Sequence, residues 1–188
     1  MSEVEWVKGF RQSIEDNLHS SDSTLSVITG EKLPYTNEIR AYGHSGDNES
    51  DFMAYETDLL IKERLPDNKW VPRVIVEAKC GSITTHDAIT YSQKAFAHRQ
   101  VHPYLRYGIL IGERGKSPLP GRLFRHGTQF DFMISWAGKE ANNQELADFV
   151  NVLMKEVEAS RTMQEIIFNS RKKDRKHYTV LHKELKLK

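Results

Sequence analysis

One short segment constrains the fold of this chain more than any other, the stretch RVIVEAKCG at positions 73–81. Its run of three β-branched apolar residues predicts a buried strand, and such strands lie inside a sheet. Glu77 and Lys79 follow in the same segment. An unpaired charge there costs several kcal/mol, on the order of the penalty for a buried ion. Both charges therefore need partners, and we expect those partners to belong to a functional site.

Length and composition predict a single cytosolic domain. The chain has 188 residues, of which 38% are apolar and 28% charged, as is ordinary for globular domains. Its start lacks the apolar core of a signal peptide, and no apolar run approaches the roughly 20 residues that span a bilayer. We therefore expect no membrane contact and a cytoplasmic location. The single cysteine, Cys80, allows no intrachain disulfide and is expected to pack as a small apolar residue.

Charge is distributed unevenly along the chain. From position 161 onward there are nine Lys and Arg against three Asp and Glu, and the remaining 18 basic and 23 acidic residues leave the body mildly acidic. We divide the chain into one domain at residues 1–160 and a basic C-terminal extension at 161–188, which belongs to the same domain. The extension is compatible with a polyanionic partner and equally with a solvated helix end.

Hydrophobic periodicity and turn residues give the expected order of elements. Helices are expected at residues 4–18, 84–102 and 142–160, and strands at 52–62, 71–80, 107–112 and 130–136. The Pro-Asp-Asn sequence at 66–68 predicts a turn that joins the first two strands into a hairpin. Residues 33–40 fit a short second helix or an entry to the sheet. This order predicts one α/β domain with a mixed central sheet flanked by helices.

Charged side chains of the hairpin are expected to meet on one patch. Residues two apart on a strand share a face, so Glu77 and Lys79 point the same way, together with Arg73. Counting inward from the turn places Asp58 of the partner strand beside Glu77. Two carboxylates with a backbone oxygen and water suit Mg²⁺, which polarises a phosphodiester and activates water, while a lysine orients that water or neutralises developing charge. Asp58 and Glu77 are thus the expected metal ligands.

Asp58 in TDLLI is followed 19 positions later by the glutamate of VEAK. This pattern resembles the PD-(D/E)XK nuclease superfamily, the restriction-endonuclease-like fold. The resemblance covers residues 37–112 and implies a core of αβββαβ order. It implies that Asp58 is the metal-binding aspartate, Glu77 the second acid and Lys79 the catalytic lysine. The implied cofactor is Mg²⁺, for which Mn²⁺ can substitute. Thr57 stands where the family has proline, at a loosely held position.

The resemblance also implies two supporting residues. Family members often have another acidic residue from an upstream helix, for which Glu38 is the best-placed candidate, followed by Glu56 and Asp51. The helix after the lysine is expected to contribute Gln93 to the wall of the active site. The candidate catalytic residues are therefore Asp58, Glu77, Lys79, Glu38 and Gln93.

The function that the resemblance implies is a Mg²⁺-dependent endonuclease acting on double-stranded DNA. A compact chain without helicase motifs is similar to type II restriction endonucleases, which usually act as homodimers on palindromic sites. The alternatives among enzymes are a structure-directed or end-directed nuclease of repair or recombination, such as a junction resolvase, and a toxin or phage-defence effector with a broader substrate. Outside enzymes, the alternative is a nucleic-acid-binding module in which Glu77 and Lys79 form a structural ion pair.

Two other motif-like stretches are rejected. The sequence GERGKS at 112–117 is not a phosphate-binding loop, because its glycines are wrongly spaced and the prolines that follow prevent the required helix. The basic residues at 114–125 instead predict a loop that contacts nucleic-acid backbone or is solvated. His98 and His102 have a zinc-like spacing without an acid between them or an obvious third ligand, so we expect two partly exposed histidines.

Overall fold

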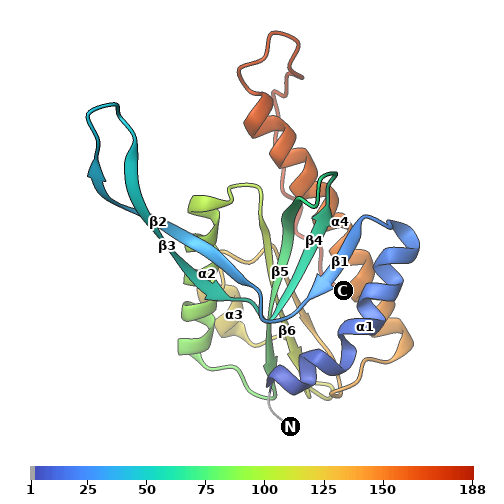
Figure 1. Ribbon diagram of the computed structural model, residues 1–188. Coiled ribbons are helices and arrows are strands. Elements are labelled where there is room, and N and C mark those ends of the chain that lie inside the picture. Colours follow the sequence, from blue (N-terminus) through green and yellow to red (C-terminus); the bar gives the residue numbers. More distant parts are fainter. Residues whose placement is uncertain (1–2) are drawn as a thin grey trace.

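The computed structural model describes residues 3–188, and these form four helices and seven strands (Figure 1). The helices are α1 (Glu3–Ser21), α2 (Thr85–Val101), α3 (Gly121–His126) and α4 (Asn143–Asn169). The strands are β1 (Leu25–Ile28), β2 (Lys32–Tyr42), β3 (Asn48–Glu56), β4 (Leu59–Arg64), β5 (Trp70–Cys80), β6 (Arg106–Gly112) and β7 (Phe132–Ser135). The fold is α/β with a mixed central sheet flanked by helices, as the sequence predicts.

Five strands form the central sheet in the order β1-β4-β5-β6-β7. The pairs β1–β4 and β4–β5 are antiparallel, whereas β5–β6 and β6–β7 are parallel. The middle strand, β5, is buried continuously over residues 71–78, which explains why its sequence is an almost unbroken apolar run. The predicted β4–β5 hairpin is confirmed. Asp67 and Asn68 take the left-handed backbone of its tight turn, with φ of 60° and 57°.

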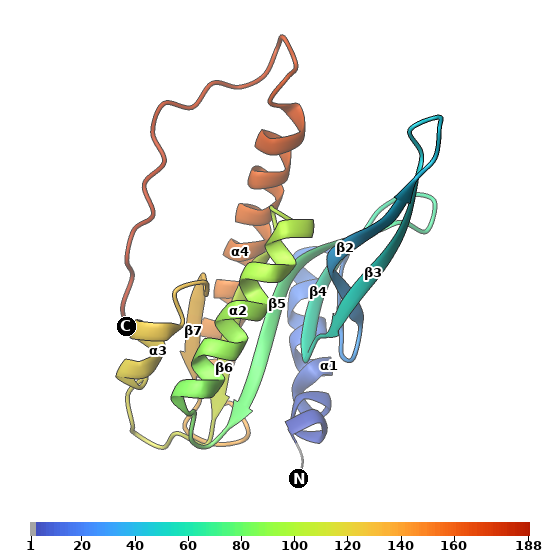
Figure 2. The same cartoon turned by 90° about the vertical axis from the view of Figure 1, so that its left-hand side faces the viewer.

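Helices cover both faces of the central sheet (Figure 2). On one face, α1 and α4 pack against Val74, Val76 and Ala78 of β5 and form the larger core. On the other face, α2 packs over Ile75. The expected alternation along this part of β5 is thus confirmed, and Glu77 points to the side that α2 covers.

The predicted strand at residues 52–62 is wrong as a single element. β3 ends and β4 begins on either side of Thr57 and Asp58, where the chain leaves one sheet and enters another. The backbone of Thr57 accepts from Gly30 N–H and donates to Glu31 O, both at 2.9 Å, which fixes this join. Apolar strands continue on both sides of it, so periodicity alone could not reveal the change of partner.

β2 and β3 form a separate two-stranded sheet, here called the arm (residues 32–56), which projects from the domain (Figure 1). Residues 33–40, for which the sequence left helix or sheet open, belong to β2. At the base of the arm Leu33 is buried in the cluster beneath α2, whereas residues 37–42 and 48–49 are exposed. The arm is therefore anchored at one end only.

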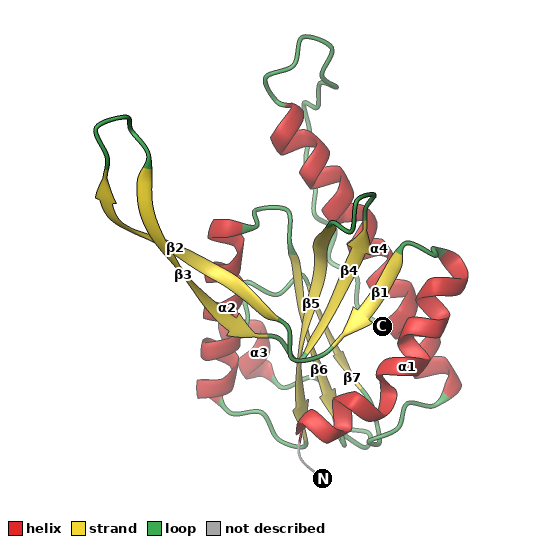
Figure 3. Cartoon of the chain, in the orientation of Figure 1, coloured by secondary structure: helices red, strands yellow, loops and turns green. Residues whose placement is uncertain are grey.

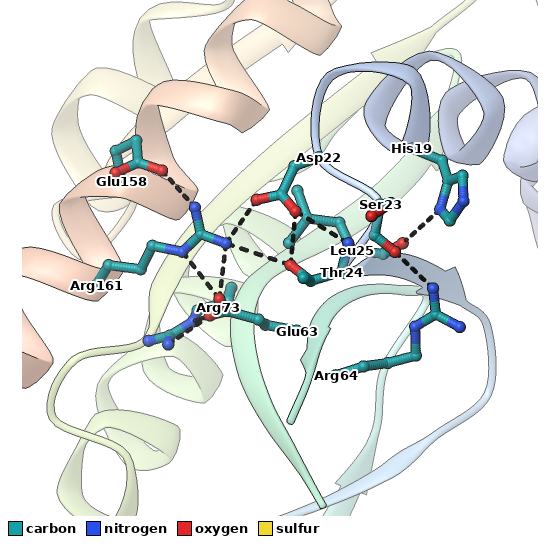
Figure 4. Close-up of polar contacts among 10 residues, drawn as sticks. All are labelled: His19, Asp22, Ser23, Thr24, Leu25, Glu63, Arg64, Arg73, Glu158 and Arg161. Atoms are coloured by element: carbon teal, nitrogen blue, oxygen red, sulfur yellow. Dashed lines mark hydrogen bonds and ion pairs between the residues drawn. The ribbon is translucent and has the colours of Figure 1, made fainter. Parts of the chain in front are cut away.

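Arg73 does not share a face with Glu77, contrary to the prediction. The β4–β5 register passes from Ile61 opposite Val74 to Lys62 opposite Pro72, so Arg73 is the extra residue of a β-bulge. Its guanidinium lies on the α4 side of the sheet and donates to Glu63 at 2.6 Å (Figure 4). The prediction was wrong because a bulge interrupts the alternation of side chains.

The C-terminal helix is longer than expected. α4 starts after Asn142, as predicted, with a capping box at this residue. It runs past residue 160 to Asn169, through the expected start of the basic extension. The chain from residue 171 to 188, here called the tail, forms neither helix nor strand and is exposed throughout (Figure 3). No helix within residues 3–188 is both long and apolar enough to cross a membrane.

Candidate active site

Asp58 and Glu77 lie together where the β4–β5 hairpin opens. The register pairs Leu59 with Val76, which sets Asp58 opposite Glu77. Oδ2 of Asp58 accepts a hydrogen bond of 2.8 Å from the backbone N–H of Ala78. Two carboxylates on adjacent strands are thus brought together, as the hairpin register predicts.

Glu77 is almost completely buried, with 1% of its surface exposed. Its Oε1 accepts a hydrogen bond of 2.5 Å from the Tyr107 hydroxyl, and Lys94 Nζ lies 3.3 Å from its Oε2. Burial, and then the negative charge of Asp58, raise the pKa of Glu77 to about 7. Burial also raises the pKa of Asp58. The two carboxylates therefore favour a cation or a proton between them.

Lys79 points from the same strand toward α1. Its Nζ lies 3.0 Å from Oε1 of Glu3, which also accepts the backbone N–H of Cys80 at 3.4 Å. The hydrogen bond to Glu3 raises the pKa of Lys79, so the ammonium group stays charged. The ion pair of Glu77 with Lys79 that the sequence left open is not formed, since each of these two residues has a different partner.

The acidic residue that α1 contributes is Glu3, whereas the sequence favoured Glu38. Glu38 lies on the exposed part of the arm, opposite Asp51, because its segment forms a strand and not a helix. Glu3 hydrogen-bonds Lys79, and its negative charge raises the pKa of Asp58. The available signal was an acid immediately before the helix predicted at residues 4–18, but its proximity to β5 depends on how that helix packs.

Lys94 of α2 is a second residue of the site that the sequence pattern does not reveal. Its Nζ contacts Glu77 and lies 5.8 Å and 5.3 Å from the ring centroids of Tyr55 and Tyr91. The neighbouring Gln93, which was expected in the wall of the site, is exposed. Gln93 is exposed because it lies nearly opposite the buried positions of α2 on a helical wheel. Those positions are Ala88, Ser92, Ala95 and His98.

His98 is fully buried, not partly exposed as expected. Its Nε2 lies 3.1 Å from the carbonyl oxygen of Leu33, and its ring packs beside those of Tyr55 and Tyr107. Burial lowers the pKa of His98 to about 4, so the ring is neutral at pH 7. This histidine joins α2 and the base of the arm to the strand that carries Tyr107.

A small pocket of about 130 Å³ opens beside Asp58, with room for several water molecules or one phosphate group. It is lined by Val4, Val7, Lys8, Thr29, Gly30, Glu56, Thr57 and Asp58. Within the described part of the chain, no group of three or more His, Cys, Asp or Glu side chains is arranged to hold a metal. The donor chemistry nevertheless fits Mg²⁺, which is commonly held by one or two carboxylates together with water and substrate phosphate.

The basic residues at 114–125 are divided between a closed loop and a short helix. Arg114 donates to the carbonyl oxygen of Pro118 at 3.1 Å, so its guanidinium closes the loop. Lys116, Arg122 and Arg125 are exposed. These three side chains are free of the loop's own hydrogen bonds and face solvent.

Comparison with known proteins adds no relative. No model of a known protein family matches the sequence, and a search of curated proteins finds no match.

Proposed function

We propose that the protein is a Mg²⁺-dependent DNA endonuclease with a restriction-endonuclease-like fold, similar to type II restriction enzymes. The observation that carries the proposal is a pair of carboxylates, the half-buried Asp58 just before β4 and the buried Glu77 on the adjacent β5, with Lys79 two residues beyond Glu77. The order of elements supports it. Without the arm, the chain reads α1, β1, β4, β5, α2, β6, which is the αβββαβ order of that fold.

Asp58 and Glu77 would hold the ion, and their raised pKa values fit carboxylates that are completed by a cation. When bound, Mg²⁺ or Mn²⁺ polarises a phosphodiester oxygen and makes water a better nucleophile. Tyr107 and Lys94 hold both oxygens of Glu77 in place. Because Glu3 keeps Lys79 charged, Lys79 is suited to neutralise charge on the phosphate and less suited to accept a proton.

Plasmid cleavage tests this function. The wild-type protein is expected to produce discrete DNA fragments with Mg²⁺ and none with chelator. The variants Asp58→Asn, Glu77→Gln and Lys79→Met are each expected to lose at least ~100-fold in rate, because each removes a charge from the site. Glu140→Gln is the matched control, since it removes an exposed acid outside the site and should cleave normally.

Other outcomes of the same experiment distinguish the alternatives. A smear in place of fragments would favour an effector with broad specificity, and preferential cutting of branched DNA would favour a recombination nuclease. DNA that is retarded on a gel but never cut, with or without Mg²⁺, would replace the nuclease by a binding module.

A further inference from the structure

The outer half of the arm, residues 37–53, exposes a set of large apolar side chains. Phe52 is 62% exposed, Ile39 46% and Tyr42 71%. The register pairs Asn37 with Phe52 and Ile39 with Ser50, so Phe52 and Ile39 are diagonal neighbours on one face of the arm. A solvent-facing apolar face on a projecting hairpin is typical of an interaction surface.

The outer arm also has open strand edges and a negative charge. The arm is a sheet of two strands, so each strand has one unpaired edge. A two-stranded hairpin is marginally stable alone in water, and only the base of this one packs on the domain. Four acidic residues against Arg40 give the outer arm a net charge of −3. Such a surface repels a phosphate backbone and attracts a basic partner.

The tail has the complementary properties. It carries eight Lys and Arg against two Asp and Glu, a net charge of +6. Leu181, Leu185 and Leu187 are 78%, 81% and 71% exposed and are an even number of residues apart, so they would share one face of an extended strand. The tail therefore has the pattern of an unpaired, basic, amphipathic strand.

The tail and the arm of one chain lie apart. Figure 2 shows the tail descending on the side of the domain opposite the arm, and Lys188 at its end pairs with Asp148 of α4 at 2.7 Å. In a symmetric dimer, a contact between the tail of one copy and the arm of the other would form twice.

We propose that the outer arm is the docking site for the tail of a second copy of this chain. The tail adds a strand to an open edge of the arm, its leucines cover Phe52 and Ile39, and its lysines neutralise the acids of the arm. None of these residues belongs to the site around Glu77. The proposal therefore stands whether or not the protein is a nuclease.

The mass of the full chain in solution, measured by light scattering, tests the proposal. At tens of micromolar the wild-type protein is expected at twice the chain mass. The double variant Leu185→Asp, Leu187→Asp and the arm variant Phe52→Asp are each expected at the mass of one chain. Phe124→Asp is the matched control, because Phe124 is 54% exposed on α3, which belongs to neither the arm nor the tail, and it should leave the mass unchanged. Circular dichroism of each variant checks that it is folded.

Mixing the arm variant with the tail variant separates exchange between copies from a contact within one chain. A mixed dimer keeps one intact contact, so the mass is expected to rise on mixing although each variant alone is a monomer. A monomeric wild-type protein, a dimer that persists in both variants, or no rise on mixing would each overturn the proposal. Weaker DNA retention by the tail variant at unchanged mass would assign the tail to nucleic acid and overturn it as well.

Discussion

The buried carboxylate of Glu77 carries much of the electrostatic cost of folding this chain. Its carboxylate is 1% exposed and lies beside Asp58, while Lys94 and the Tyr107 hydroxyl oppose the rise in its pKa. The pKa reaches about 7 from an ordinary value of 4.5. Between these values the folded chain binds more protons at Glu77 than the unfolded chain does. The free energy of unfolding therefore decreases as pH rises from about 4.5 through about 7.

The variant Glu77→Gln is expected to lack this decrease. Relative to the wild type, it should gain roughly 2–4 kcal/mol of unfolding free energy between pH 4.5 and pH 8, because a neutral amide has no charge to bury. Urea unfolding at several pH values, in buffer with chelator, measures this change. The slopes of unfolding free energy against pH are compared between the variant and the wild type, because glutamine also alters the contact with Lys94 at every pH.

The control for that experiment is Glu140→Gln, which removes an exposed carboxylate. It should leave the pH dependence of the wild type unchanged. If Glu77→Gln shows the same dependence as wild type, Glu77 ionises normally in the folded protein and the electrostatic description of the site is wrong.

At the scale of elements, one arginine joins α4 to the rest of the domain. Nη2 of Arg161 donates to Asp22, in the loop before β1, and to Glu63 of β4, both at 2.7 Å (Figure 4). Glu63 also accepts from Arg73 at the β-bulge. Hydrogen bonds from Thr24 and Arg161 lower the pKa of Asp22 to about 2. The contacts fix the helix that leads into the tail.

The variant Arg161→Met keeps an aliphatic side chain of similar length but removes these bonds. It is expected to lower the free energy of unfolding by about 1–2 kcal/mol, because Asp22 loses its charged donor and Glu63 keeps only the one from Arg73. Urea unfolding followed by circular dichroism measures the loss.

Arg64→Met is the matched control for Arg161→Met. Arg64 is exposed and donates to the carbonyl oxygen of Ser23, so its loss should cost less than about 0.5 kcal/mol. Equal losses in the two variants would mean that the contacts of Arg161 do not stabilise α4.

At the scale of the whole molecule, the candidate site is assembled from segments far apart in the chain. Glu3 comes from α1, Asp58 from the join between β3 and β4, Glu77 and Lys79 from β5, and Lys94 from α2. Among them are three carboxylates and two ammonium groups, so the site has one more negative charge than positive when all are ionised. A bound cation would balance that excess.

If the proposed function holds, Glu3 and Glu38 differ in their effect on cleavage. Glu3→Gln is expected to raise the Mg²⁺ concentration for half-maximal cleavage about 10-fold, because it removes negative charge near Asp58 and the partner of Lys79. Glu38→Gln should leave it unchanged, since Glu38 lies on the exposed arm. A Mg²⁺ titration of cleavage rate measures both, and the reverse order of effects would contradict the assignment of Glu3.

The sequence by itself determined the features that depend on neighbouring residues. The apolar run of residues 74–78 predicts the buried strand β5, Thr84 starts α2 with a capping box, and the turn at 66–68 joins β4 and β5 into a hairpin. Each of these follows from local backbone preference or from a period of two residues, so a short window contains the information.

Only the tertiary structure decided which distant groups meet these residues. Whether Glu3 reaches Lys79 depends on how α1 packs on the sheet, and whether Lys94 reaches Glu77 depends on the rotation of α2. The separation of the arm from β4 depends on backbone bonds of Thr57 to the chain after β1. These contacts arise from the packing of whole elements, and helical or strand periodicity does not specify which elements pack together.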